Sequence, residues 1–419
     1  MGTDQATEPT SQQPSPALSL CMIVKNEEAA LPRCLRSVRD QVDEIVIVDT
    51  GSSDKTVEIA ESFGAKVYHH PWENDFSKHR NQSLSYARGD WIFILDADEE
   101  VESSEAPKLR EIIRDSDACS FFLPVVLVNS SGEGHVQHNW IRLFRNHLGN
   151  HYRGIVHNML VHKGPSRFAP IRVYHYGNSL SPEKMHEKFL RTSTLLKRQL
   201  AEDPENFLAH HYLGVAYLGQ EDCPRAYEEA KTSLTLARQQ GVVSEHVAEI
   251  YYVLVSSVFR LGRLGEAEFY ALEAVRFHPL HVDSYCLLCS IYWTQNRLQE
   301  FLTISDRYLE ILQLLETDPG RFGTVGIFTE RVLWKVHLFR GLALSHLGRS
   351  AEREAEFQEA LKTAGPNAEC HRILGAFFAE AGESARAWDH FQRALRLAPA
   401  DAASRKALRR LELREAAPT

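Results

Sequence analysis

Three stretches near the N-terminus decide the fold of this 419-residue chain: LSLCMIVKNEE at 18–28, EIVIVDTGSSDKT at 44–56 and WIFILDADEE at 91–100. Each is an apolar run that ends abruptly in a cluster of polar residues. This texture predicts buried strands, because strands covered on both faces by helices are apolar along their whole length.

Amphipathic segments separate the apolar runs. We expect strands at 18–24, 44–48, 66–70 and 91–95, and helices near 28–40, 54–63, 76–88 and 103–115. Such alternation predicts a mostly parallel, Rossmann-like α/β sheet. Ligands bind these sheets at the carboxyl ends of the strands, so the polar cluster after each strand is where function is expected.

From about residue 181 the pattern is almost wholly helical, and it repeats. Comparable residues recur at Gly214, Val255, Cys289, Gly341 and Gly375, with two of the four intervals equal to 34 residues. Small residues let paired helices approach closely, so the pattern predicts a stacked all-α solenoid. An irregular helical bundle is the alternative.

The bulk composition excludes several classes of protein. A net charge of −9 argues against nucleic acid as the main partner, and no apolar run is long enough for a transmembrane segment.

Residues 1–17 are expected to form a disordered leader without a signal peptide. The CxxC pair Cys286 and Cys289 lies in an apolar helical pattern, so core packing is expected rather than metal or redox use. A cytoplasmic location fits these features.

The fourth predicted strand, at 91–95, is followed by Asp96-Ala97-Asp98-Glu99-Glu100. Two carboxylates two positions apart repel each other, and a divalent cation relieves that repulsion; oxygen ligands suit Mg²⁺ or Mn²⁺. Such a cation can bridge the phosphates of a nucleotide-sugar and stabilise a departing diphosphate. The alternative is a solvated acidic turn that opens a helix.

Two other polar positions have candidate roles. Asp49, at the end of a strand, can accept a hydrogen bond from a base N–H, or it can bond the amides of the following turn. Arg80, on a predicted helix, can donate two hydrogen bonds to phosphate oxygens or stack on a base. The alternative is that Arg80 lies on the solvent-exposed face of the helix.

Taken in order, LSLCMIVKNEE, EIVIVDTGSSDKT, DFSKHRNQSL and WIFILDADEE resemble the family-2 glycosyltransferases of the GT-A fold. The helical part resembles tetratricopeptide repeats, and the fusion resembles a bacterial subgroup whose members include peptide and protein glycosyltransferases. The domains expected are a GT-A domain at 18–180, a linking helix at 181–203, about five repeats at 204–400, and a capping helix with a tail at 401–419.

The resemblance implies an inverting transfer from a UDP-sugar. By analogy Asp49 contacts the uracil and Arg80 the base or diphosphate, while Asp96 lies near the ribose and Asp98 binds the metal. The remaining positions implied in nucleotide-sugar binding are Val24, Asn26, Glu27, Gly51 and Ala97.

One departure from related sequences concerns the catalytic base. They often read His-Glu where this chain reads His157-Asn158. Direct displacement needs a base to take the acceptor's proton. Glu99, Glu133, His157 and His175 are the candidates. Either histidine can instead be a metal ligand, the role expected for His175, or a hydrogen-bonded structural residue.

The function expected is transfer of a hexose or N-acetylhexosamine from a UDP-sugar to a peptide or protein side chain, with Mg²⁺ or Mn²⁺ as cofactor and the acceptor held partly by the repeats. Two rivals stay open. One is the same chemistry on a lipid-linked or surface glycan; the other is an inactive transferase domain that serves as a repeat-based scaffold. Homo-oligomer formation is also left open.

Overall fold

The computed structural model describes residues 17–114, 116–128, 134–177, 182–244, 246–322, 326–327, 329 and 332–415. Residues 1–16 of the expected leader and the candidate base Glu133 lie outside these described residues. The chain divides into two compact units, Met1–Ala216 and Tyr217–Thr419.

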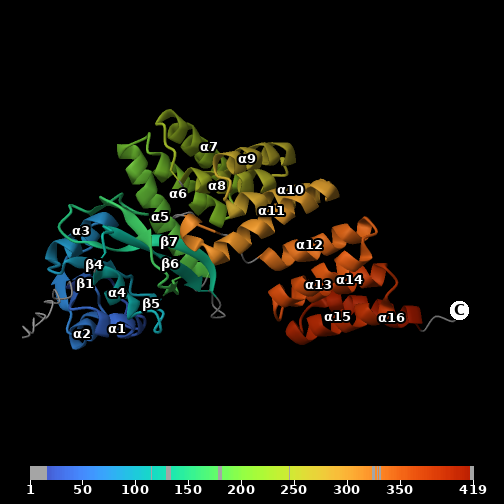
Figure 1. Ribbon diagram of the computed structural model, residues 1–419, viewed down its shortest axis with the longest axis horizontal. Helices are drawn as coiled ribbons and strands as arrows, with labels where there is room; N and C mark the ends of the chain where they lie inside the picture. Colours follow the sequence, from blue (N-terminus) through green and yellow to red (C-terminus); the bar gives the residue numbers. More distant parts are fainter. Residues whose placement is uncertain are drawn as a thin grey trace, which may run out of the picture. The chain divides into compact units, whose positions relative to one another are not determined.

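Parallel strands form the first half of the sheet in the N-terminal unit (Figure 1). They are β3 (Lys66–His69), β2 (Glu44–Asp49), β1 (Leu18–Val24) and β4 (Trp91–Ile94), in that spatial order. β1 pairs in parallel with both β2 and β4, so the carboxyl ends of these strands meet at one edge. Each strand lies within one residue of its predicted bounds.

Beyond β4 the sheet is mixed. Its other strands are β7 (Gly134–Arg145), β6 (Ser120–Val128), β11 (Val173–His175), β5 (Glu99–Val101) and β10 (Ser166–Phe168). β7 runs antiparallel to both β4 and β6, while β5 closes the edge antiparallel to β11. β8 (His151–Arg153) and β9 (Met159–Val161) form a separate pair.

A β-bulge interrupts the pairing of β6 with β7. The partners shift from Phe121–Leu143 to Phe122–Ile141, which leaves Arg142 as the extra residue on β7. Bulges re-aim a side chain and are frequent beside active sites. Here the bulge turns Arg142 toward the carboxyl end of β4.

Hydrophobic clusters cover both faces of the sheet. Leu20 and Phe93 belong to one cluster, and their neighbours Cys21 and Ile94 belong to the other, as expected for strands that are apolar along their whole length. The helices are α1 (Leu31–Val38), α2 (Thr56–Ser62), α3 (Phe76–Tyr86), α4 (Lys108–Arg114) and the long α5 (Pro182–Glu202).

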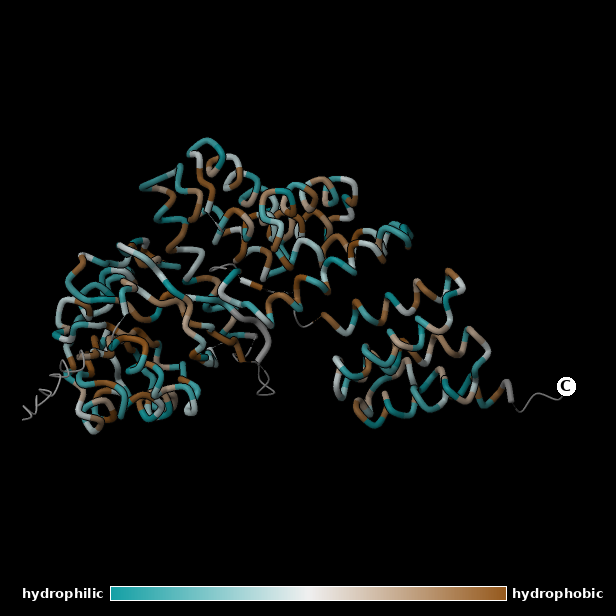
Figure 2. Tube along the Cα trace, in the orientation of Figure 1, coloured by the Kyte–Doolittle hydropathy of each residue, from teal (hydrophilic) through white to brown (hydrophobic). Residues whose placement is uncertain are grey.

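The rest of the chain is helical. In order come α6 (Phe207–Gly219), α7 (Cys223–Gln239), α8 (His246–Arg260), α9 (Leu264–Phe277), α10 (Val282–Thr294), α11 (Leu298–Thr317), α12 (Leu333–His346), α13 (Ser350–Ala364), α14 (Ala368–Glu380), α15 (Ser384–Leu397) and α16 (Ala402–Glu415). Hydrophilic and hydrophobic residues alternate along these helices (Figure 2).

Small residues mark the close approach of helices in the C-terminal unit, as the repeat pattern predicted. A Cβ on Gly341 of α12 would lie 2.4 Å from the ring of Phe357 on α13. The equivalent Cβ on Gly375 of α14 would lie 2.9 Å from Phe391 on α15. Both phenylalanines follow their glycine by sixteen residues, so the spacing in the sequence reports a packing contact. Cys286 and Cys289 are buried in α10 and unpaired.

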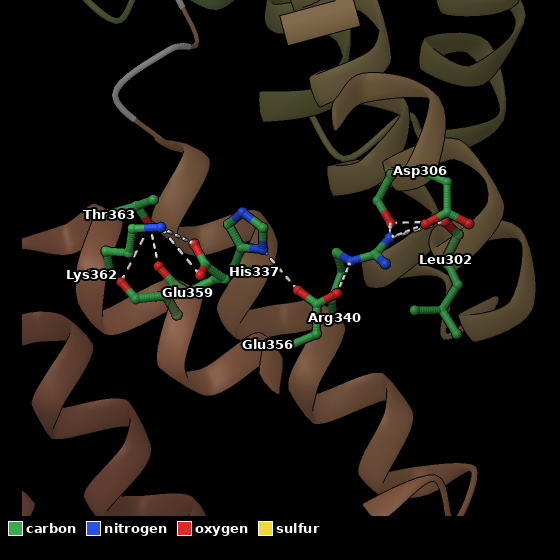
Figure 3. Close-up of polar contacts among 10 residues, drawn as sticks. Leu302, Asp306, His337, Arg340, Glu356, Glu359, Lys362 and Thr363 are labelled. Carbon is green, nitrogen blue, oxygen red and sulfur yellow. Dashed lines mark hydrogen bonds and ion pairs between the residues drawn. The ribbon is translucent and has the colours of Figure 1, made fainter. Parts of the chain in front are cut away.

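A polar cluster joins the third and fourth helix pairs (Figure 3). Arg340 of α12 donates to Asp306 Oδ1 on α11 and to Glu356 on α13, both at 2.7 Å. Glu356 also contacts Nδ1 of His337 at 2.7 Å. Arg340 and Glu356 are mostly buried, so this contact ties α11, α12 and α13 together.

Candidate functional site

The loops after β1 and β2 are bonded to each other. Asn26, in the left-handed region at φ 56°, accepts a hydrogen bond from the Ser53 amide at 2.8 Å and donates its own amide to Ser52 Oγ at 2.9 Å. The carbonyl of Val24 accepts from the Thr50 amide at 2.9 Å. These bonds hold the predicted base-pocket segment against the end of β2.

The carboxylate of Asp49 is buried inside its own turn. It accepts from the amides of Gly51 at 3.1 Å and Ser52 at 3.2 Å, and His69 Nδ1 lies 3.5 Å away. Gly51 adopts φ 105°, a conformation that favours glycine. The turn-forming alternative for Asp49 is therefore present in the structure, and its contact with a uracil stays a prediction.

Two arginines hold Asp96. Arg80 Nη2 of α3 donates to Oδ1 at 2.6 Å, and Arg142 Nη1 lies 3.9 Å from Oδ2. Burial alone would raise the pKa of Asp96, but the charges of Arg80 and Arg142 outweigh it and lower the pKa to about 2. The Arg80 guanidinium also lies 5.3 Å from the ring centroid of Tyr152. Arg80 is therefore engaged with the site and is not a solvated helix residue.

Glu99 is fully buried beneath the same segment. Its Oε2 accepts from the Asp96 amide at 2.9 Å, and its Oε1 is paired with Arg142. His175 Nδ1 lies 3.5 Å from that same oxygen. A buried carboxylate with both oxygens engaged is badly placed to take a proton from an acceptor, so the geometry corrects the expectation of Glu99 as a base. It holds the segment in place.

Asp98 and His175 face each other across the edge of the sheet. His175 Nδ1 lies 3.5 Å from Asp98 Oδ1, and the Tyr176 amide donates to the Asp98 carbonyl at 3.0 Å. Burial raises the pKa of Asp98. Burial would lower the pKa of His175, but contact with Glu99 and the charge of Asp98 raise it.

These two residues fit a divalent cation that takes its other ligands from substrate and water. A Cβ on Gly177 would come within 2.2 Å of Asp98 Oδ2 and 2.9 Å of His175 Nε2, so only glycine leaves room at this point. Within the described residues no group of three or more His, Cys, Asp or Glu could hold a metal by itself. Mg²⁺ usually binds one or two carboxylates plus phosphates and water, and its presence here stays a prediction.

Glu27 lies near the same carboxylates. Its amide donates to Thr56 Oγ1 at 2.7 Å. Burial, followed by the charges of Asp98 and Asp96, raises the pKa of Glu27 to about 7. Ala97 between the two aspartates is buried in the core, which anchors the segment.

His157 lies in a different setting. It adopts φ 47°, and its ring stacks on Tyr212 of α6 with centroids 4.2 Å apart. Burial against this neighbour, with the nearby His211 and Lys188, lowers the pKa of His157. Nδ2 of the next residue, Asn158, is buried and has no hydrogen-bond partner in the described part of the chain.

Two site residues were missed from the sequence. Arg142 reaches the site because of a β-bulge that the sequence pattern does not predict. Lys188 lies on the linking helix α5, near Asp98. Only the position of each charge relative to the carboxylates in space reveals them. The structure thus brings Glu27, Arg80, Asp96, Asp98, Glu99 and His175 together, while Asp49 and Asn26 hold the neighbouring turn and His157 packs on α6.

Comparison with known proteins indicates the class of protein to which the N-terminal unit is similar. The family described as "Glycosyl transferase family 2" matches residues 19–174. The chain is 35% identical over 264 residues to a "TPR repeat-containing protein" of Synechococcus elongatus, covering 60% of this chain and 64% of the relative. It is 30% identical over 198 residues to the "SPbeta prophage-derived glycosyltransferase SunS" of Bacillus subtilis, covering 46% and 47%. The chain therefore spans about half to two thirds of the length of these curated relatives.

Among solved structures, the APC/C hetero-tetramer Cut9–Hcn1 aligns with a TM-score of 0.43 and 14% identity, covering 55% of this chain and 40% of that one. This likeness is distant. Residues 19–174 of the N-terminal unit thus match the model of the family-2 glycosyltransferases, and the relative from Synechococcus elongatus is described as a protein with TPR repeats. Among the described residues, no helix is both long and apolar enough to cross a bilayer.

Proposed function

We propose that the chain is a metal-dependent, inverting glycosyltransferase that moves a hexose or N-acetylhexosamine from a UDP-sugar to a peptide or protein side chain. The observation that carries this proposal is the pairing of Asp98 with His175 beside an ionised Asp96 at the carboxyl end of β4. Parallel α/β sheets bind ligands at this edge.

The residues divide into three groups by role. Asp98 and His175 would hold the cation, whose charge would neutralise the diphosphate when it is bound. Arg80 and Asp96 form an ion pair that can reorganise around the ribose and phosphates, while the bonded turns around Asn26 and Asp49 shape the base pocket. Glu99 and Arg142 keep this edge rigid from below.

The acceptor's proton needs a base. Glu27 is half-buried near Asp96 and Asp98. Burial, followed by the charges of these carboxylates, raises its pKa, and a bound cation would lower it. His157 lies beside Tyr212, and Glu133 lies outside the described residues. The base therefore stays with the candidates His157 and Glu133.

The repeats support a peptide or protein as the acceptor. Solenoids present extended surfaces that suit a polypeptide better than a small sugar. In the N-terminal unit, α5 is bonded to the catalytic domain because Gln199 Oε1 accepts from the Ile155 amide at 3.2 Å. Helix α5 is thus packed within the N-terminal unit.

A panel of UDP-sugars with Mg²⁺ and Mn²⁺ tests the proposal by the UDP released. Slow hydrolysis of one donor, without acceptor, would identify it. Proteins and peptides, compared with lipid-linked and surface glycans, then separate the acceptor classes. Binding of UDP without turnover of any donor would favour the scaffold alternative, with Asn158 in place of a catalytic glutamate.

A further inference from the structure

Helix α5 presents one face to the catalytic domain. Arg198 Nη2 donates to the Asn74 carbonyl at 3.0 Å, and the Arg191 guanidinium lies 5.8 Å from the ring centroid of Phe76. Residues three or four apart share a helix face. Lys188 lies one turn before Arg191, so the packed face of α5 carries Lys188 toward the site.

The side chain of Lys188 is half-buried and has no ion-pair partner among the described residues. It interacts electrostatically with Asp98 and with His157, yet it forms no hydrogen bond or ion pair with any described residue. Burial lowers the pKa of Lys188, and the charge of Asp98 opposes that effect. Burying a charge without a partner is costly, so a protein keeps such a group where an anion joins it.

Two other cations at this edge already have carboxylate partners. Arg80 is bonded to Asp96, and Arg142 is paired with Glu99. Lys188, which lies near Asp98, has no carboxylate of its own among the described residues, and the same holds for its neighbour Arg191 over Phe76. Lys188 is therefore available to a ligand without breaking an existing ion pair.

We propose that Lys188, which lies near Asp98, binds the diphosphate of the nucleotide-sugar donor. This inference rests on the proposed function. During transfer, the acceptor's nucleophile forms a bond to the anomeric carbon, and the bond from that carbon to the β-phosphate oxygen breaks. The electron pair stays on that oxygen, and the acceptor's proton passes to a base. The ammonium of Lys188 stabilises the negative charge that builds up on the leaving diphosphate.

The test compares UDP with uridine, which lacks the phosphates. Calorimetry at saturating Mg²⁺ measures UDP, and competition against UDP measures uridine, for the wild type, Lys188→Ala, Lys188→Arg and the matched control Lys184→Ala on the exposed first turns of α5. We expect Lys188→Ala to weaken UDP binding by about ten- to a hundredfold, the value of one hydrogen bond between charged groups. Uridine binding should be unchanged, Lys188→Arg should retain much of the affinity, and Lys184→Ala should match the wild type.

Two results would overturn the inference. Equal UDP affinity in Lys188→Ala and wild type would show that the ammonium does not touch the diphosphate, and a carboxylate of the acceptor would become the better partner. A parallel loss of UDP and uridine binding would show a structural role for Lys188. Failure of the wild type to bind UDP at all would instead refute the proposed function, and this inference with it.

Discussion

Nδ1 of His175, at the end of β11, lies 3.5 Å from Oδ1 of Asp98, which follows β4. The two residues are 77 positions apart in the sequence, and β11 reaches this edge by pairing with β5.

If both hold the cation, His175→Ala should raise the Mn²⁺ concentration for half-maximal activity by about ten- to a hundredfold, the usual effect of weakening a metal site. Titration of metal against donor hydrolysis measures it, with the exposed His151→Ala as control. An unchanged metal requirement would leave His175 as a structural partner only.

Gly177→Ala should damage the same site by steric means. The new Cβ would lie 2.2 Å from Asp98 Oδ2, so that carboxylate must move. We expect donor hydrolysis to fall at least tenfold while the thermal midpoint changes little. Gly265→Ala, where a Cβ meets nothing within 4 Å, is the matched control. Wild-type activity in Gly177→Ala would show that the position of Asp98 does not matter.

Arg80→Met tests the ion pair with Asp96. Removing the guanidinium leaves a half-buried carboxylate less well paired, and we expect a loss of about 1–3 kcal/mol in the free energy of unfolding. The folded pKa of Asp96 is depressed to about 2, so its contribution to stability is present above its unfolded pKa of about 3.9 and is lost as the pH falls toward 2.

The stability difference between wild type and Arg80→Met should therefore be full at pH 7 and should shrink between about pH 4 and pH 2. Urea unfolding across this range measures it. A difference that stays constant down to pH 2 would mean that Arg80 stabilises the fold by packing on Tyr152 and not by its charge.

Much of this architecture could be predicted, and the reason is local. Polar residues in the sequence mark the ends of the apolar runs that form β1 to β4. Gly341 and Phe357, sixteen residues apart, pack against each other within one helix pair. The second half of the sheet could not be predicted. β7 is antiparallel and bulged at Arg142, and β5 and β11 are three residues long, too short for any periodicity to appear.

The same limit applies to the site. Asp96 and Asp98 follow a strand and could be predicted as a pair. In the sequence Glu99 is one more acidic residue of that turn, but in the structure it forms an ion pair with the buried Arg142 of β7. Lys188 sits in an ordinary amphipathic helix pattern, and only the packing of α5 brings it near Asp98.

Gly341→Ala tests the repeat packing. The added methyl group would lie 2.4 Å from Phe357, and overpacking of this kind typically costs about 1–3 kcal/mol. Thermal unfolding should show a lower midpoint for this variant, and Gly341→Ala with Phe357→Leu should recover part of the loss. Should the single variant unfold like the wild type, the helices at this point have room that the structure does not show.

The most direct test of the central claim is UDP release by the wild type and by Asp98→Ala, each with Mn²⁺ and with EDTA, across a panel of UDP-sugars. Asp98 is the carboxylate expected to hold the cation, and its substitution leaves the buried Glu99–Arg142 pair intact. The account predicts release from at least one donor by the wild type with Mn²⁺, none above background with EDTA, and none from a folded Asp98→Ala in either condition. Equal release with EDTA, or from Asp98→Ala, would contradict a metal-dependent glycosyltransferase.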